Sequence, residues 1–201
     1  MGSTLDRSGS TDCEKIKARI LEFIRKNLTE KRLKHTYAVA ETAVELAEKY
    51  GADKCRAALA ALFHDMCRSF STDVSDMYVR QLGLPDVYAG KKNLAHSKIA
   101  AELMRRDFGI TDRELLDAVS YHTTGRAGMT LLEKIIFIAD AVEPGRDYPG
   151  VEEIRELAYH DLDRACIRSL EGTVEHIRRQ GGYLDPDTSK ARDYLKENTD
   201  L

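Results

Sequence analysis

The sequence has no apolar stretch long enough to cross a membrane, because its longest unbroken apolar run is "AALAALF" at 57–63. It also has no stretch like a signal peptide, since "MGSTLDRSGS" is polar and lacks an apolar centre. No CxxC pair occurs among the cysteines, which are Cys13, Cys55, Cys67 and Cys166. This scatter favours reduced thiols over a disulfide framework or a thiolate zinc site. We therefore expect a soluble protein of the cytoplasm, without a membrane partner.

The sequence also has little excess charge of either sign. Its 31 lysines and arginines stand against 34 aspartates and glutamates, which gives a formal net charge of −3. Proteins that bind nucleic acid usually present a strongly basic surface, so we expect neither DNA nor RNA as a partner. Any anionic ligand has to be held by local cations or by metal ions.

The pattern of apolar residues predicts helices and no strands. Three segments match the capping box, in which a threonine and a glutamate satisfy backbone donors at a helix start: "TDCE" at 11–14, "TDRE" at 111–114 and "TLLE" at 130–133. We find no alternating pattern and no internal repeat. The length of 201 residues, 42% of them hydrophobic, suits one domain with a real core. We predict an all-α fold with a flexible segment at 1–10 and one domain at 11–201.

Caps, breakers and apolar spacing set the expected helix boundaries. Thr29 is expected to start a helix that Gly51 ends, and Asp53 to start the next, which runs to His64. The first helix is expected to begin at the box at 11–14. The remaining helices are expected at about 72–82, 94–108, 112–121, 131–142, 151–159, 162–180 and 188–197.

The stretch "LAALFHDMCRSF" at 59–70 raises the question of function. It begins as a buried helical stripe and then places His64 beside Asp65. An ionised carboxylate at such a place is costly unless another charge compensates it. A second apolar helix, "KIIFIA" at 134–139, also ends in a carboxylate, that of Asp140. The repeated pattern indicates a site that needs carboxylates.

Four of the six histidines fit such a site. His35, His64, His96 and His122 lie on, or at the end of, four different predicted helices. Helical bundles build metal sites in this way, and imidazole with carboxylate suits iron, manganese or zinc. Taken alone, an adjacent His-Asp pair is more often a coincidence than a site. His160 and His176 are expected to lie outside it.

Several phrases together resemble the HD superfamily of metal-dependent phosphohydrolases, and within it the YqeK branch of symmetrical diadenosine tetraphosphate hydrolases. They are "LKHTYAVAETAVELAEKYG", "ALFHDMCR", "LAHSKIAAELM", "YHTTGRAGMTLLEKIIFIADAVEPGRDYPGV" and "DLDRA". The long phrase at 121–151 is the specific one, and the likeness runs from about 33 to 195. The resemblance implies a single helical HD domain with a metal site among its helices.

The resemblance also implies a ligand set and a reaction. One iron would be held by His35, His64, Asp65 and Asp140, and Asp65 would bridge to a second metal site completed by His96 and His122. Manganese, cobalt or zinc are alternatives to iron. Asp65, His96 and His122 would act in catalysis, in which metal-activated water cleaves diadenosine tetraphosphate into two ADP.

Further residues are expected to bind the nucleotide. In "HTTGRAGMT" at 122–130, Thr123, Thr124 and Arg126 can hold phosphate, although a solvated turn fits the composition equally well and only the resemblance favours the phosphate loop. Arg146 matches an arginine that the family places on phosphates. Tyr183, with Leu184 beside it, is expected near a nucleobase. The ligands His35, His96, His122 and Asp140 would also contact the nucleotide.

Other functions remain open at this point. The same ligands would serve another HD phosphohydrolase, acting on mononucleotides or guanosine alarmones. A nucleotide-binding regulatory domain with a silent metal site is the alternative outside enzymes. Arg68 stands where the family commonly has lysine, which puts a catalytic role there in doubt. The expected partner is a small nucleotide, and a homodimer is left open.

Overall fold

The structure is a computed structural model that describes residues 7–199, with side chains from residue 12 onward. Helices connected by short loops account for all the regular structure in this range. They are α1 (Arg7–Asn27), α2 (Glu30–Tyr50), α3 (Lys54–His64), α4 (Thr72–Gln81), η1 (Asp86–Tyr88), α5 (Lys92–Asp107), α6 (Arg113–Ser120), α7 (Leu131–Val142), α8 (Val151–Ala158), α9 (Leu162–Arg179) and α10 (Pro186–Asn198). The predicted all-α fold is confirmed.

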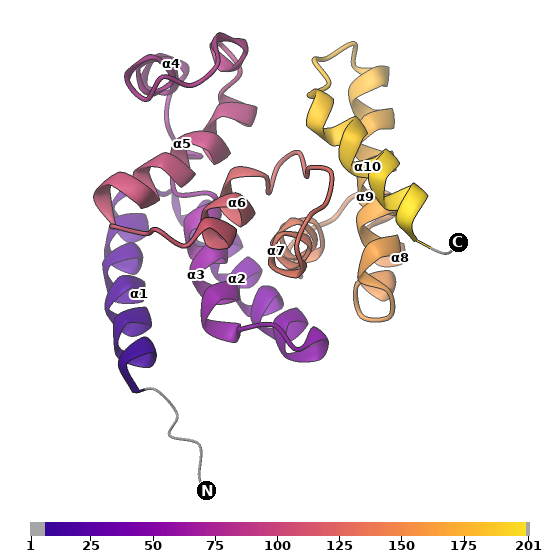
Figure 1. The fold of residues 1–201 in the computed structure, drawn as a ribbon. Coiled ribbons are helices and arrows are strands. Elements are labelled where there is room, and N and C mark those ends of the chain that lie inside the picture. The colour runs from indigo at the N-terminus through magenta and orange to yellow at the C-terminus, as the bar shows by residue number, and fades with distance from the viewer. Residues whose placement is uncertain (1–6, 200–201) are drawn as a thin grey trace, which may run out of the picture.

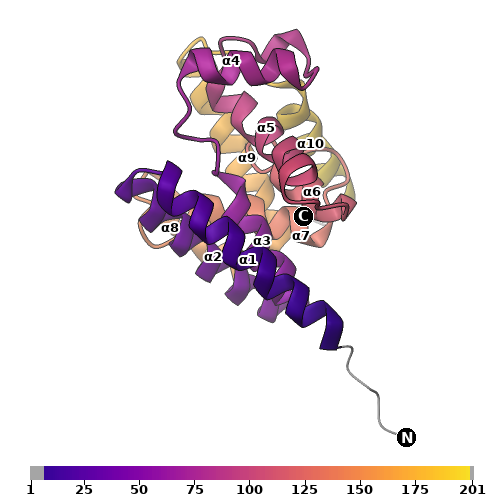
Figure 2. The same cartoon turned by 90° about the vertical axis from the view of Figure 1, so that its left-hand side faces the viewer.

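Helix α7 occupies the middle of the molecule. It packs against α2, α3 and α6 on one side and against α8 and α9 on the other, as Figure 1 shows. Seven of its residues between 132 and 139 are buried, which suits a helix surrounded by others. Helix α4 lies at the opposite end of the molecule from the start of α1 (Figure 2). Central packing gives Asp140, near the end of α7, a fixed position.

Several predicted helix ends are confirmed. The Thr29 side chain accepts a hydrogen bond from the Arg32 backbone N–H, and Asp53 caps α3 in the same way. Gly51 ends α2 with φ of 73°, a left-handed conformation that glycine adopts without steric cost. Both hydrogen bonds of the capping box formed by Thr130 and Glu133 are present. These ends fix the elements that carry His35, His64 and Asp140.

One predicted helix start and one predicted helix cap are wrong. Helix α1 begins at Arg7, so the box at 11–14 lies inside the helix, and of the predicted flexible segment only residues 1–6 lie outside the described residues. Helix α6 is capped by Asp112, whose side chain accepts from the Leu115 backbone N–H, and Thr111 is not the cap. An aspartate next to a threonine can cap equally well, so the sequence pattern could not choose between them.

The expectation of four reduced cysteines is wrong for two of them. Cys13 and Cys55 form a disulfide between α1 and α3, with Cα atoms 6.6 Å apart. The partners are 42 residues apart in sequence and meet only because the two helices pack side by side. Spacing along the chain could not reveal this. Cys67 and Cys166 are free and buried.

A helix that crosses a membrane has to be both long and apolar. Within residues 7–199, none is both long enough and apolar enough to cross a membrane.

Candidate metal centre

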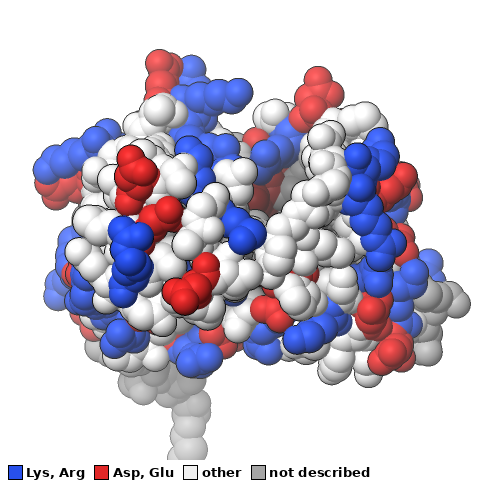
Figure 3. All heavy atoms as spheres, turned by 90° about the horizontal axis from the view of Figure 1, so that it is seen from above, with Lys and Arg blue, Asp and Glu red and all other residues white. Residues whose placement is uncertain are grey.

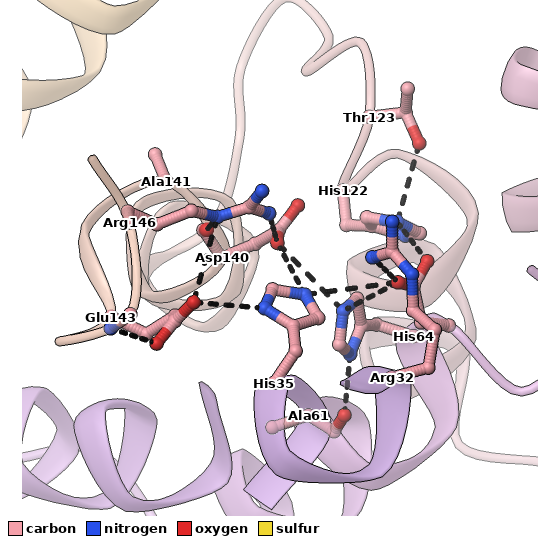
Figure 4. Close-up of polar contacts among 12 residues, drawn as sticks. Arg32, His35, Ala61, His64, His122, Thr123, Asp140, Ala141, Glu143 and Arg146 are labelled. Atoms are coloured by element: carbon pink, nitrogen blue, oxygen red, sulfur yellow. Dashed lines mark hydrogen bonds and ion pairs between the residues drawn. The ribbon is translucent and has the colours of Figure 1, made fainter. Parts of the chain in front are cut away.

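The fold brings all six predicted ligands together (Figure 4). They come from five parts of the chain: α2 supplies one histidine, α5 and α7 supply one residue each, and the ends of α3 and α6 supply the others. Five of the six side chains are at most 10% exposed, and Asp140 is 23% exposed. The set is His35, His64, Asp65, His96, His122 and Asp140. Residues spread over about half of the chain therefore form one buried polar cluster.

One half of the cluster is built around Asp140. The Nε2 atom of His35 lies 3.1 Å from Asp140 Oδ1, and Nε2 of His64 lies 3.9 Å from the same oxygen. The candidate ligand atoms of these three residues all lie within 4.8 Å of one another. This spacing is compatible with a single metal ion in contact with all three.

The other half is built around Asp65. Its Oδ1 atom lies 3.1 Å from Nε2 of His96 and 3.9 Å from Nε2 of His122. Its Oδ2 atom lies 3.6 Å from Nε2 of His64 and 3.7 Å from Nε2 of His35. The two oxygens of Asp65 therefore face different halves of the cluster, as a bridging carboxylate would. A second group within 4.8 Å consists of His64, Asp65 and His122, so His64 is common to both halves.

Hydrogen bonds at Nδ1 determine how three of the imidazoles point. Nδ1 of His64 donates to the Ala61 carbonyl at 2.6 Å, and Nδ1 of His122 donates to the Val119 carbonyl at 2.8 Å. Nδ1 of His35 donates to Glu143 Oε1 at 3.0 Å. A carbonyl or carboxylate oxygen can only accept, so these rings carry their proton on Nδ1. Neutral rings of this tautomer turn an Nε2 lone pair into the cluster, the usual arrangement of metal-bound histidine.

These Nε2 atoms provide a test of whether a metal fits. Among the described residues, Nε2 of His35 and Nε2 of His64 are buried without a hydrogen-bond partner. Nε2 of His96 and Nε2 of His122 face each other 3.1 Å apart. Buried lone pairs without donors are unfavourable, and a divalent ion would satisfy them. The residues fit a metal centre.

The electrostatics of the cluster agree with this conclusion. Burial lowers the pKa of His64, and it lowers that of His122 to about 3, so both rings are neutral at pH 7. Burial alone would raise the pKa of Asp65 and Asp140, but the neighbouring histidines, and Arg146 beside Asp140, hold both pKa values below the usual range. Neutral imidazoles and ionised carboxylates are the forms that bind metal.

Two residues of this centre were not predicted from the sequence. Arg32 donates from Nη1 to Asp65 Oδ2 at 2.6 Å, so it supplies part of the charge that compensates Asp65. Glu143, whose side chain is 5% exposed, accepts from His35 and from the Gly145 backbone N–H. Each lies three residues from a predicted ligand: Arg32 precedes His35 on α2, and Glu143, the C-cap residue of α7, follows Asp140. The helical spacing that places i and i+3 on one face could have found both.

Only some of the predicted phosphate-binding residues contact the cluster. Arg146 donates from Nε to the Asp140 carbonyl at 2.7 Å and from Nη2 to the Asp140 carboxylate, so it lies at the cluster. Thr123 Oγ1 lies 3.3 Å from His122 Nε2. Thr124 is buried and donates to the Gly125 carbonyl. Arg126 forms two hydrogen bonds, of 2.6 and 2.8 Å, to the buried carboxylate of Glu133. Phosphate at Arg126 would compete with this ion pair.

The remaining predicted residues lie outside the cluster. Tyr183 is 41% exposed, with Nζ of Lys91 4.7 Å from the centre of its ring, and Leu184 is half-buried. Arg68 donates to Asn93 at 2.6 Å. His160 and His176 are exposed, as expected for residues outside the site.

Comparison with known proteins identifies the architecture. The sequence pattern of the family described as the HD domain matches residues 32–145, a range that contains all six cluster residues. The chain belongs to the HD domain family. A solved structure from Clostridium acetobutylicum, described as that of a predicted HD superfamily hydrolase involved in NAD metabolism, superposes with a TM-score of 0.86 at 37% identity. The match covers 91% of this chain and 98% of that one.

Relatives of this HD chain carry more specific names. It is 39% identical over 176 residues to a protein of Bacillus subtilis, covering 87% of this chain and 95% of the relative. It is 40% identical over 173 residues to a protein of Halalkalibacterium halodurans, covering 86% and 92%. Both relatives are named symmetrical bis(5'-nucleosyl)-tetraphosphatase. The histidine–aspartate centre is thus found in an HD domain that resembles phosphohydrolases over most of its length.

Proposed function

We propose that this HD protein is a symmetrical bis(5'-nucleosyl)-tetraphosphatase that hydrolyses diadenosine tetraphosphate to two ADP. The observation that carries the proposal is the cluster itself, in which the Nε2 atoms of four histidines face two ionised carboxylates. This donor set suits metal-assisted hydrolysis, and relatives at 39–40% identity bear the name of this activity.

The proposed cofactor is iron, as one or two ions, with manganese, cobalt or zinc as alternatives. When bound, such ions polarise the scissile phosphate and lower the pKa of water towards ~7. His35, His64 and Asp140 would hold one ion, and His96 and His122 would hold the other. Asp65 lies between the two groups and would touch both.

The charge of the remaining phosphates has to be met by nearby side chains. Positive and negative residues are mixed over the face seen in Figure 3, in keeping with the net charge of −3. Arg32 and Arg146 already lie against the cluster and keep further N–H groups available for phosphate oxygens. The hydroxyl of Thr123 can donate on the other side. These groups orient the substrate and neutralise its charge in the transition state.

Symmetrical cleavage requires a fixed distance between the held nucleoside and the metal centre. If the loop at 122–126 and Tyr183 hold one nucleotide, its second phosphate falls on the cluster. In-line attack there expels the other half of the molecule as ADP. Attack one phosphate away would give ATP and AMP instead.

A substrate panel with metal analysis tests the proposal. Protein purified without chelator should contain metal and release ADP from diadenosine tetraphosphate faster than it hydrolyses mononucleotides or guanosine alarmones. Early products are separated by chromatography. Equal amounts of ATP and AMP without ADP would refute symmetrical cleavage, and bound metal without turnover would favour a silent regulatory domain. A cytoplasmic location and a homodimer stay predictions.

A further inference from the structure

A pocket of about 930 Å³ lies between the first turns of α2 and the loop that follows α7. This volume is at the upper end of ordinary ligand sites, which span roughly 300–1,000 Å³. Its walls include Lys31, Arg32, Lys34, Arg146, Asp147 and Tyr148. Most of these residues have no role in the function proposed above.

The pocket is continuous with the metal centre. His35, Glu143 and Arg146 belong to both, and Arg32 reaches from the pocket wall to Asp65. In Figure 4, Arg146 and Glu143 lie on one side of His35 and His64, whereas His122 and Thr123 lie on the other. The pocket wall formed by Glu143 and Arg146 therefore lies on the side of the centre away from His122 and Thr123, whereas Arg32 extends the pocket to the side of His122.

The pocket walls carry the chemistry that recognises a nucleotide. Lys31, Arg32, Lys34 and Arg146 are cationic, and the first three lie at the N-terminal end of α2, where the helix dipole also favours anions. Lys34 pairs with Glu30 at 2.8 Å, whereas Lys31 forms no ion pair among the described residues. The carboxylate of Asp147, an exposed residue, can accept hydrogen bonds from ribose hydroxyls.

Tyr148 adds a surface for a base. Its hydroxyl donates to the Ala141 carbonyl at 2.8 Å, which fixes the ring, and the residue remains 37% exposed. A ring that is held at one end and exposed on a face can stack on any nucleobase without first becoming ordered. Cations near the cluster with an aromatic ring in the same cavity match a phosphate chain that ends in a nucleoside.

We propose that this pocket binds the second nucleotide of the substrate, the half that leaves as ADP. The inference rests on the proposed function, because a dinucleoside polyphosphate has a nucleotide on each side of the bond that breaks. Lys31 and Lys34 receive the distal phosphates, Asp147 the ribose, and Tyr148 the base. The pocket is thereby the feature that favours dinucleoside over mononucleoside polyphosphates.

The test compares two substrates with the same scissile bond. Diadenosine tetraphosphate has a nucleoside at both ends, whereas adenosine 5'-tetraphosphate lacks the second one and would give ADP and pyrophosphate. Tyr148→Ala should raise KM for the dinucleotide roughly tenfold, because base stacking is lost, and leave KM for the mononucleotide unchanged. Tyr148→Phe keeps the ring but loses the hydrogen bond that fixes it, so its KM for the dinucleotide should lie between those of wild type and Tyr148→Ala. Lys31→Ala is expected to raise KM for the dinucleotide by a smaller factor.

The controls distinguish a failure of the proposed subsite from a failure of the proposed hydrolase function. Lys49→Ala changes an exposed lysine at the far end of α2 and should alter neither substrate's kinetics. Metal content should stay at the wild-type level in all variants. Equal changes for both substrates, or no change in Tyr148→Ala, would overturn the subsite. Absence of dinucleotide hydrolysis by the wild-type protein would refute the function itself.

Discussion

The two halves of the metal centre differ in the hydrogen-bond partners that hold their histidine rings. In the half that contains His35, a buried carboxylate holds the ring, because Glu143 accepts from Nδ1 and is itself bound by the Gly145 N–H. In the half that contains His96, Nδ1 of that ring is buried without a hydrogen-bond partner within residues 7–199. The two halves therefore differ in how firmly the protein orients their imidazoles.

This difference has a consequence for metal affinity. A carboxylate on Nδ1 fixes a histidine ring and raises its basicity, which strengthens binding at Nε2. Burial lowers the pKa of His35, but the nearby Asp140 carboxylate and the hydrogen bond to Glu143 outweigh it, so that its pKa is raised. We expect the half with His35 and Asp140 to bind its ion more tightly than the half with His96 and His122.

The largest effect is expected from removing the residue that both halves share. Asp65→Ala takes away the carboxylate that faces each half, so metal and hydrolysis should both be lost, with some loss of stability from the missing metal linkage. His160→Ala, on the exposed surface, should retain both. Full metal occupancy in the Asp65 variant, measured by elemental analysis, would disprove the assignment.

A more conservative substitution, at Glu143, should remove the difference in metal affinity between the two halves. Glu143→Gln keeps the size of the side chain but removes the negative charge next to His35. Loss of such an outer partner typically lowers metal affinity by roughly 10–100-fold. Titration against a chelator should show the tighter ion weakened and the weaker ion unchanged. Unchanged affinity of the tighter ion would show that Glu143 does not set the difference.

Arg146 and Arg126, both predicted to bind phosphate, should differ in their effect on catalysis. Arg146 lies on Asp140, whereas Arg126 lies on Glu133, away from the ligands. A charge-assisted contact is worth ~1.5–3 kcal/mol, so Arg146→Ala should lower kcat/KM by one to two decades with metal content unchanged. Arg126→Ala should affect catalysis less, because its guanidinium is engaged with Glu133. Wild-type efficiency of both variants with diadenosine tetraphosphate would rule out the phosphate site.

The smallest effect is expected at Thr123. Its hydroxyl lies 3.3 Å from Nε2 of His122 and can donate either to that ring or to a phosphate oxygen. Thr123→Val removes one neutral hydrogen bond, worth ~0.5–1.5 kcal/mol, so kcat/KM should fall by a few-fold at constant metal content. Steady-state kinetics with a metal assay on the same samples would detect this, and a loss of metal would show that the hydroxyl instead supports His122.

The sequence predicted the six residues that the fold brings together better than it predicted the side chains that support them. His64, Asp65 and Asp140 stand out because polar residues end apolar helices. His35, His96 and His122 stand out because each lies on, or at the end of, a different predicted helix, and the family resemblance then implied that they are ligands. Arg32 and Glu143 were missed because charged residues on helix faces are common, and only the folded chain shows which of them point inward. Arg126 was assigned to phosphate because of the family resemblance, whereas the structure pairs it with Glu133. The sequence could not show that the Glu133 carboxylate both completes the capping box and pairs with Arg126.

The link between Cys13 and Cys55 encloses all of α2 within a covalent ring. Unfolding with this bond intact leaves a closed loop in place of a free chain, which in the chain-entropy model destabilises the unfolded state by ~4 kcal/mol for a loop of this size. The helix that carries His35 therefore remains tethered near α1 even when neighbouring segments open. The thiol–disulfide balance of its surroundings thus sets part of the thermal tolerance of the protein, independently of the groups that carry out its chemistry.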